Sequence, residues 1–334
     1  MRWTSVIAAV FLSLAGSAQA LAEEPRQCWT QSALGGTEAE LKHVFNHRSL
    51  DLAPLRQVTL APATPVAPAF RGSIRSVELP ADKKLIALTF DLCEENGYVS
   101  GYDGRIVDFL RAQGVKATFF AGGKWMETHP ERAQQLIADP LFEVGSHGLR
   151  HLDLSHTNDA TLGEEITLTE AAYARARAAL ASRQCLVGAS QPQPPERMTL
   201  FRFPYGRCND KALVAAADAG LRSIQWDLVT GDPDPLVPAK TIANRILTKA
   251  HPGAIVVAHA NGNGHNTAAA LAIALPKLKE EGYGFVTVSE LIAAGKPVIA
   301  TRCYQENPGD MTRVAHSAPR RGSHDLFSIF GAPN

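Results

Sequence analysis

Short apolar runs alternate with amphipathic stretches through the middle of the chain, and turn-forming residues separate them. Runs rich in branched and aromatic side chains predict strands that are buried on both faces. In chain order, the predicted strands are Leu85 to Phe90, Ala117 to Ala121, Phe142 to Gly145, Thr199 to Phe203, Arg222 to Trp226, Ala254 to Ala258 and Phe285 to Val288.

The stretches between these runs carry apolar residues at helical spacing, each preceded by a residue that can cap a helix N-terminus. The predicted capping residues are Asp103, Thr161 (in a capping box with Glu164) and Asn209, and Thr267 precedes a further stretch with Leu271, Leu275 and Leu278 at helical spacing. Strands alternating with helices indicate parallel βα units. About seven such units would close into a barrel.

The ends of the chain differ from this middle part. Residues 1–20 combine a positive start, an uncharged apolar stretch and the small residues Ala18 and Ala20, which predicts a secretory signal peptide. We expect residues 21–80 to form an N-terminal extension or linker and residues 81–298 to form a single catalytic domain. Residues 299–334 are expected to form a C-terminal tail. We therefore expect an exported protein, periplasmic or secreted, with no membrane span.

Charge and size narrow the function further. Lys plus Arg and Asp plus Glu number 33 each, so the chain has no net positive charge that would attract nucleic acid. The 334 residues, 45% of them hydrophobic, are enough for one large core.

The five cysteines make disulfides permissible in an exported chain, and the odd number leaves at least one thiol free. Connectivity does not follow from sequence. Our hypothesis pairs Cys28 with Cys303 and Cys185 with Cys208, and leaves Cys93 as a free thiol near the active site.

Candidate chemistry begins where the first strand ends. Asp91 follows that strand, at the end where parallel α/β folds carry their catalytic loops. His147 and His151 are four residues apart, so on a helical turn both rings would face one metal ion. An acid with a histidine pair indicates a metal-dependent hydrolase.

The order of these motifs resembles that of the polysaccharide deacetylase family (NodB-homology domain, carbohydrate esterase family 4). Thr89-Phe90-Asp91, Lys116 to Phe120 and Ser146-His147 to His151 match its first half, and the likeness covers roughly residues 80 to 295. The resemblance implies a distorted (β/α)7 barrel of the polysaccharide deacetylase type. It also implies a hydrolase acting on carbon-nitrogen (non-peptide) bonds.

The resemblance assigns Asp91 as the base that takes a proton from water, and His147 and His151 as metal ligands. The family's second aspartate, a further ligand, is Leu92 here, and Gly148 stands where Ser or Thr is usual. A third ligand could come from Cys93, Glu94 or Glu95, from water or from nowhere. Two imidazoles favour Zn²⁺ over Mg²⁺ or Ca²⁺.

Later motifs complete the candidate site. Arg202 would hold Asp91 ionised, and the turn at Pro204 would aim the backbone N–H of Tyr205 at an oxyanion. His259 would protonate the leaving amine. Its partner is expected to be Asp232, followed by Pro233 where Trp is usual, with Asp227 as the second choice. Trp226 is interpreted as a core residue rather than a sugar platform.

These assignments predict metal-assisted deacetylation of N-acetylated glycans, of the peptidoglycan or chitin type. Three alternatives remain open: an O-acetyl polysaccharide esterase, a cyclic amide hydrolase on the same fold, and a catalytically dead glycan-binding relative. Leu92 and Pro233 motivate the last of these.

Overall fold

The computed structural model describes residues 28–42, 44–45, 49–95, 97–183, 194–308 and 310. The predicted signal peptide and Cys185 lie outside these residues.

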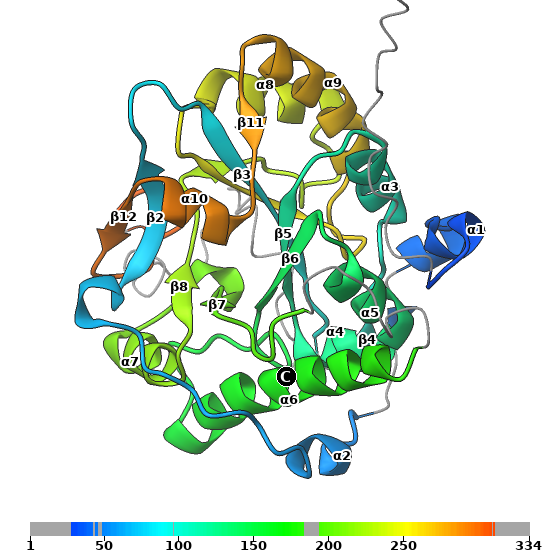
Figure 1. Cartoon of the computed structure of the whole chain (residues 1–334), viewed down its shortest axis with the longest axis vertical. Coiled ribbons are helices and arrows are strands. Elements are labelled where there is room, and N and C mark those ends of the chain that lie inside the picture. Colours follow the sequence, from blue (N-terminus) through cyan, green and yellow to red (C-terminus); the bar gives the residue numbers. More distant parts are fainter. Residues whose placement is uncertain are drawn as a thin grey trace, which may run out of the picture.

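A curled ten-stranded sheet forms the centre of the molecule, with helices around it (Figure 1). Nine of its strands follow one another in space in the order β12 (Lys296–Ala300), β2 (Ser73–Glu78), β8 (Arg222–Ile224), β7 (Leu200–Phe201), β6 (Phe142–Ser146), β5 (Ala117–Ala121), β3 (Leu85–Leu92), β10 (Ile255–His259) and β9 (Leu228–Val229). The tenth, β11 (Gly284–Phe285), pairs with β3.

All of these pairings are parallel except that of β12 with β2. An isolated bridge between Ser76 and Ala254 connects β2 with the residue before β10, so the sheet curls back on itself. This confirms the predicted fold class, a distorted (β/α)7 barrel. A separate antiparallel pair joins β1 (Val44–Phe45) to β4 (Tyr98–Val99).

Helices cover the outside of the sheet. They are α1 (Gln31–Leu34), α2 (Ala53–Arg56), α3 (Gly104–Ala112), α4 (Gly123–Thr128), α5 (Pro130–Ala138), α6 (Asp159–Ala181), α7 (Asp210–Asp218), α8 (Ala239–Lys249), α9 (Thr267–Glu280) and α10 (Val288–Ala294), with the 3-10 turns η1 (Glu38–Leu41), η2 (Pro68–Phe70) and η4 (Pro204–Gly206). Among the described residues, none of these helices has the length and apolar character needed to cross a bilayer.

The apolar runs located most strands, and β5 has the predicted ends. The run from Phe285 to Val288 was wrong at its end, because Val288 begins α10. Thr287 and Glu290 form a reciprocal capping box that starts this helix.

Two predicted helix caps are confirmed and one is wrong. Asp103 accepts a hydrogen bond from the N–H of Arg105, and Asn209 from the N–H of Ala212. The capping box at Thr161 does not form, because α6 starts two residues earlier. Its cap is Asn158, whose side chain accepts the Thr161 N–H at 2.9 Å.

Alternation along the strands sorts their side chains between two hydrophobic clusters. Phe90 and Leu92 of β3 belong to the large cluster under the helices, whereas Ala87 belongs to the smaller cluster with Ile255 and Val257 of β10. Side chains on a strand alternate between its faces, so Asp91 shares the face of Ala87, and His259 shares that of Val257. Both functional side chains therefore face the inside of the barrel.

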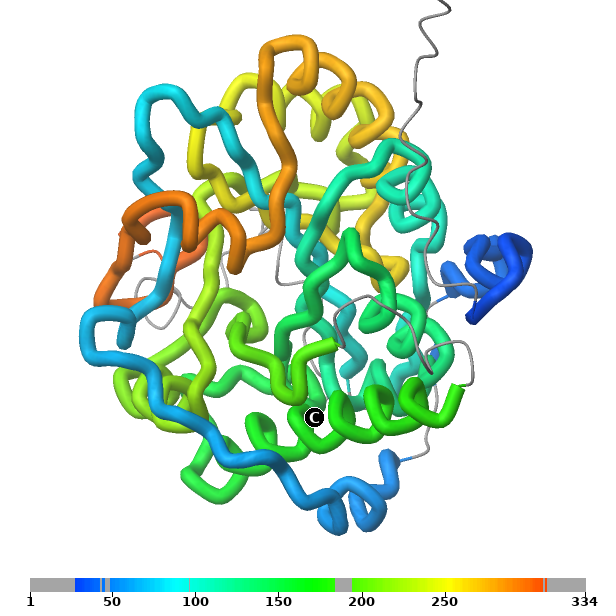
Figure 2. Tube along the Cα trace, viewed as in Figure 1, coloured from blue at the N-terminus to red at the C-terminus, as the bar shows by residue number. Residues whose placement is uncertain are grey.

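The segments flanking the predicted catalytic domain pack against it. Helix α2, on the blue N-terminal segment in Figure 2, lies against α6. Strand β2 lies in the predicted N-terminal extension, and β12 crosses the boundary that we predicted at residue 298. Both belong to the central sheet, while the domain boundaries themselves stay predictions.

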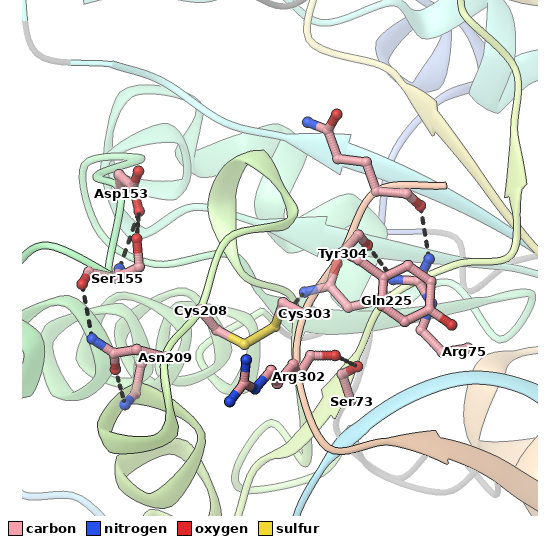
Figure 3. Close-up of a disulfide and its surroundings, with 12 residues drawn as sticks. Ser73, Arg75, Asp153, Ser155, Cys208, Asn209, Gln225, Arg302, Cys303 and Tyr304 are labelled. Atoms are coloured by element: carbon pink, nitrogen blue, oxygen red, sulfur yellow. Dashed lines mark hydrogen bonds between the residues drawn. A yellow bond between two sulfur atoms is a disulfide. The ribbon is translucent and has the colours of Figure 1, made fainter. Parts of the chain in front are cut away.

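A disulfide joins Cys208 to Cys303 (Figure 3). The predicted pairs of Cys28 with Cys303 and of Cys185 with Cys208 are therefore wrong. Cys28 is disulfide-bonded as well. Sequence separation could not reveal the observed pair, because the return of β12 along β2 is what brings residue 303 beside the turn after β7. The expectation that Cys93 is a free thiol is confirmed.

Candidate active site

The candidate site lies where the carboxyl ends of β3 and β10 meet. These neighbouring parallel strands pair in a register that sets His259 opposite Asp91. A cavity opens over them, and both residues line it together with Cys93, His151 and Tyr205. Folding thus gathers most of the residues that the sequence nominated around one pocket.

Asp91 is buried and held as a carboxylate by Arg202. The guanidinium Nη1 of Arg202 donates to Asp91 Oδ1 at 2.8 Å, and both side chains are almost fully buried. Burial acts to raise the pKa of Asp91, but the charge of Arg202, together with that of His259, outweighs it and lowers the pKa below its usual value. Asp91 is therefore ionised and oriented, as a general base must be.

Arg202 is itself fixed by the strand next to it. Its Nε and Nη2 donate to the backbone carbonyls of Ile224 and Gln225, at 3.4 and 3.3 Å. The guanidinium also lies over the rings of Phe120 and Trp226, 4.0 and 5.4 Å from their centroids. These contacts direct the charge of Arg202 at Asp91.

His259 forms a pair with Asp232. Its Nδ1 lies 3.0 Å from Asp232 Oδ1, and its backbone N–H donates to Oδ2 at 2.8 Å. Burial acts to lower the pKa of His259, but the carboxylate of Asp232 outweighs it and raises the pKa to about 9. The ring therefore carries a proton at neutral pH, as an acid catalyst requires.

Two hydroxyl groups complete the shell around Asp232. Thr230 Oγ1 donates to its Oδ1 at 2.8 Å, and Thr267 Oγ1 donates to its Oδ2 at 2.7 Å. Sequence reasoning assigned neither threonine a role at this site, because their relation to Asp232 appears only when the loops after β9 and β10 fold together.

Asp227, the second choice for this partner, lies elsewhere. It accepts the N–H of Ile255 at 2.9 Å and lies 2.7 Å from His251 Nε2. Ile255 begins β10 and His259 ends it, so Asp227 is at the opposite end of that strand. Trp226, by contrast, is buried among apolar residues and also lines the cavity.

Tyr205 lies on the sharp turn η4 with a φ of 59°, a left-handed conformation that is uncommon for a bulky residue. His151 has a φ of 56°, and the two rings lie 4.4 Å apart. The hydroxyl of Tyr205 donates to Glu95 Oε1 at 3.1 Å. Residues with strained backbone conformations cluster at functional sites, and here two of them line one pocket with their rings in contact.

Cys93, His147 and His151 form a group that can bind a metal ion. One ligand atom from each lies within 4.8 Å of the other two. Burial lowers the pKa of His147 to about 4, which keeps this ring neutral. Burial also acts to lower the pKa of His151, but the neighbouring Cys93 and Glu95 outweigh it and raise the pKa to about 10. A metal bound here would displace that proton.

The donor set fits a divalent metal. The Nδ1 of His147 lies 2.8 Å from the carbonyl oxygen of Arg202, so Nδ1–H can donate to it and leave Nε2 as the ligand atom. Nδ1 of His151 is buried and has no hydrogen-bond partner among the described residues. Imidazole and thiolate ligands suit zinc.

Comparison with known proteins indicates the same family as the sequence motifs do. A family model described as polysaccharide deacetylase matches residues 78–224. A peptidoglycan-N-acetylglucosamine deacetylase of Bacillus cereus is 32% identical over 217 residues, which are 64% of this chain and 91% of that protein. Peptidoglycan-N-acetylmuramic acid deacetylase PdaA of Bacillus subtilis is 27% identical, over 63% of this chain and 72% of that protein.

The similar solved structures include a deacetylase and a pseudoenzyme. The structure of a peptidoglycan N-acetylglucosamine deacetylase bound to a hydroxamate-type ligand (a 4-naphthalenyl-N-oxidanyl-benzamide) has a TM-score of 0.54 and 27% identity, covering 66% of this chain and 93% of that one. A CE4 family pseudoenzyme from Bacillus anthracis has a TM-score of 0.54 and 26% identity, covering 66% and 69%. The fold, the motifs and these relatives agree, and this chain belongs to the polysaccharide deacetylase family.

Proposed function

We propose that this chain is an exported, metal-assisted hydrolase that removes acetyl groups from N-acetylated glycans of the peptidoglycan or chitin type. The main support is that Asp91 and His259, held in opposite protonation states, face one cavity beside two histidines of a possible metal group. Peptidoglycan deacetylases among the relatives favour this class of substrate.

Each residue then has a distinct task. Asp91, kept ionised by Arg202, accepts the proton of the attacking water. The backbone N–H of Tyr205 would donate to the tetrahedral oxyanion. His259, kept protonated by Asp232, gives its proton to the departing amine. A divalent metal on His147 and His151, when bound, would supply Lewis-acid stabilisation of the developing charge.

An amide substrate suits this arrangement well, because an amine leaves readily only after it is protonated. A histidine whose pKa is about 9 supplies that proton across the neutral range. The proposed order is attack on the acetyl carbonyl, then transfer of the proton to nitrogen and release of acetate.

Acetate release from a panel of substrates tests this proposal. We expect the full chain, supplied with Zn²⁺, to release acetate from N-acetylglucosamine oligomers or peptidoglycan, and Asp91→Ala to stay at background. Release from O-acetyl xylan or ring opening of a small cyclic amide, without release from N-acetyl sugars, would overturn the choice of substrate.

A catalytically dead glycan-binding module is the second candidate. It is favoured by Leu92, which has no ligand atom, and by the similarity to a CE4 family pseudoenzyme. Binding of chitin oligomers with no acetate release above the Asp91→Ala background would support this candidate and reject the hydrolase.

A further inference from the structure

The family's usual third ligand position cannot bind a metal in this chain. Leu92 ends β3 with its side chain fully buried in the hydrophobic cluster that also contains Phe90. On a strand, that face is opposite the one bearing Asp91. The side chain therefore packs among apolar neighbours.

Cys93, the next residue, brings its sulfur to the histidine pair instead. Its ligand atom and those of His147 and His151 all lie within 4.8 Å of one another. In a tetrahedral zinc site with bonds of about 2.0 to 2.3 Å, two ligand atoms lie about 3.3 to 3.8 Å apart. Side-chain rotations that bring these atoms together by at most about 1.5 Å would therefore close the group around an ion.

The surroundings of Cys93 orient it as a ligand. Asn261 is fully buried in the loop after β10, and its Nδ2 donates to the carbonyl oxygen of Cys93 at 3.0 Å and to its sulfur at 3.1 Å. These two hydrogen bonds fix the position of the Cys93 sulfur beside the histidine pair. Asn261 thus corresponds to the outer hydrogen-bonding shell found around metal ligands.

The neighbouring carboxylates each have another hydrogen-bond partner. Glu94 is buried, accepts hydrogen bonds from Thr128 and from the N–H of Ser100, and lies 3.3 Å from Lys124 Nζ. Asp91 is bound by Arg202 through Oδ1, and its Oδ2 lies 3.6 Å from Nε2 of His147. Glu95 accepts a hydrogen bond from Tyr205 and lies 3.6 Å from Nδ1 of His151. Neither carboxylate belongs to the group whose ligand atoms all lie within 4.8 Å of one another, which consists of Cys93, His147 and His151.

We propose that the thiolate of Cys93 is the third protein ligand of the metal, so that the site is Cys-His-His. The inference rests on the metal dependence in the proposed function. A soft sulfur ligand makes the site selective for zinc, or cobalt as a substitute, over manganese and magnesium. It also makes metal binding sensitive to thiol alkylation.

X-ray absorption of the zinc-loaded full chain tests the ligand directly. We expect one sulfur at about 2.3 Å and nitrogen or oxygen ligands at about 2.0 to 2.1 Å. The cobalt-loaded chain should show a thiolate charge-transfer band in the near ultraviolet. Bound metal should also protect Cys93 from iodoacetamide.

Three variants complete the experiment, with circular dichroism as the check on folding. Cys93→Ser should lose the sulfur signal and weaken zinc binding by more than the 10- to 100-fold typical of outer-shell changes. Cys93→Asp should bind zinc through oxygen. Glu95→Gln, the matched control at the neighbouring carboxylate, should keep the sulfur signal.

Two results would overturn the assignment: a zinc spectrum without sulfur in the wild type, or equal zinc affinity in wild type and Cys93→Ser. The ligand assignment and the deacetylase proposal can fail separately. A zinc–sulfur signal without acetate release would support Cys93 as a ligand and reject the deacetylase activity. Acetate release with only nitrogen and oxygen around zinc would support the activity and reject Cys93 as a ligand.

Discussion

At the scale of single residues, the proposed mechanism depends on two buried ion pairs that hold opposite protonation states. Arg202 holds Asp91 ionised and ready to accept a proton, whereas Asp232 holds His259 charged and ready to give one. Neighbouring groups whose pKa values are pushed in opposite directions define the acid and the base of a hydrolytic site.

Asp232→Asn should shift the alkaline limit of activity. In the proposed mechanism His259 acts in its protonated form. The kcat of the wild type should therefore stay constant with rising pH until the pH reaches the raised pKa of His259, about 9, and should fall above it. Without the carboxylate, burial dominates and lowers the pKa of His259, which moves this limit below neutral pH. We expect kcat at pH 8 to fall about 100-fold or more.

The control for this variant is Asp227→Asn, at the aspartate–histidine pair that Asp227 and His251 form beside the start of β10. Its pH profile should match that of the wild type. An unchanged alkaline limit in Asp232→Asn would show that His259 is not the acid.

Arg202→Met should destabilise the fold, because it leaves the Asp91 carboxylate buried without its counter-charge. We expect a loss of about 3–5 kcal/mol in the free energy of unfolding, measured with urea. Adding Asp91→Asn should recover part of that loss without recovering activity.

The matched control is Arg207→Met, at a half-exposed arginine that pairs with Asp153. It should cost less than about 1 kcal/mol. A similarly small cost for Arg202→Met would contradict the view that this ion pair is held by burial.

Sequence alone predicted which residues gather at the cavity better than it predicted their partners. Asp91 and His259 lie at the carboxyl ends of β3 and β10, and His151 follows β6, so all three reach one cavity at the same end of the sheet. Asn261, by contrast, reaches Cys93 from a loop 168 residues away, and no local pattern announces such a contact.

At the scale of elements, strongly apolar strands were predicted with better bounds than short ones. β3, β5 and β10 are buried on both faces, and so their sequences are continuous apolar runs. The run from Arg222 to Trp226 located β8, which ends at Ile224, whereas the two residues of β9 are too few to form a pattern and were not predicted. The amphipathic helix α8, between β9 and β10, was not predicted.

The sequence predicted the segment after β12 only as a C-terminal tail, with no function assigned to it. The disulfide to Cys208 fixes Cys303, and Arg75 donates to the carbonyls of Tyr304 and Gln305 at 2.5 and 2.7 Å (Figure 3). Gln305 also donates to the carbonyl of Tyr205 at 3.3 Å, and Gln305 and Glu306 line the cavity. This segment therefore forms part of the cavity wall.

Replacing both Cys208 and Cys303 by Ser should loosen this wall. We expect the free energy of unfolding to fall by about 2–4 kcal/mol. The KM for a glycan should rise more than kcat falls, because the catalytic pairs lie on other elements. Ser73→Ala, which removes only a hydrogen bond to Arg302, is the control. Unchanged KM in the double variant would show that the segment does not contact substrate.

At the scale of the whole molecule, the metal group joins distant parts of the fold. Cys93 follows β3, whereas His147 and His151 follow β6, with β5 lying between these strands. An ion bound here would therefore link the segments that follow β3 and β6 across the intervening β5, and it would stabilise the folded state over the unfolded chain.

Zinc should raise the melting temperature of the chelator-treated protein. At 100 times the dissociation constant, the expected stabilisation is about 2.7 kcal/mol. A double variant, His147→Ala with His151→Ala, should show no such response. An equal shift in that variant would place the stabilising ion elsewhere.

The most direct test of the central claim is acetate release from N-acetylglucosamine oligomers by the zinc-loaded chain, compared between Asp91→Asn and Asp227→Asn. If Asp91 and the cavity at the end of β3 carry out the reaction, the first variant falls to background and the second keeps the wild-type rate. Equal rates in the two variants would contradict that claim.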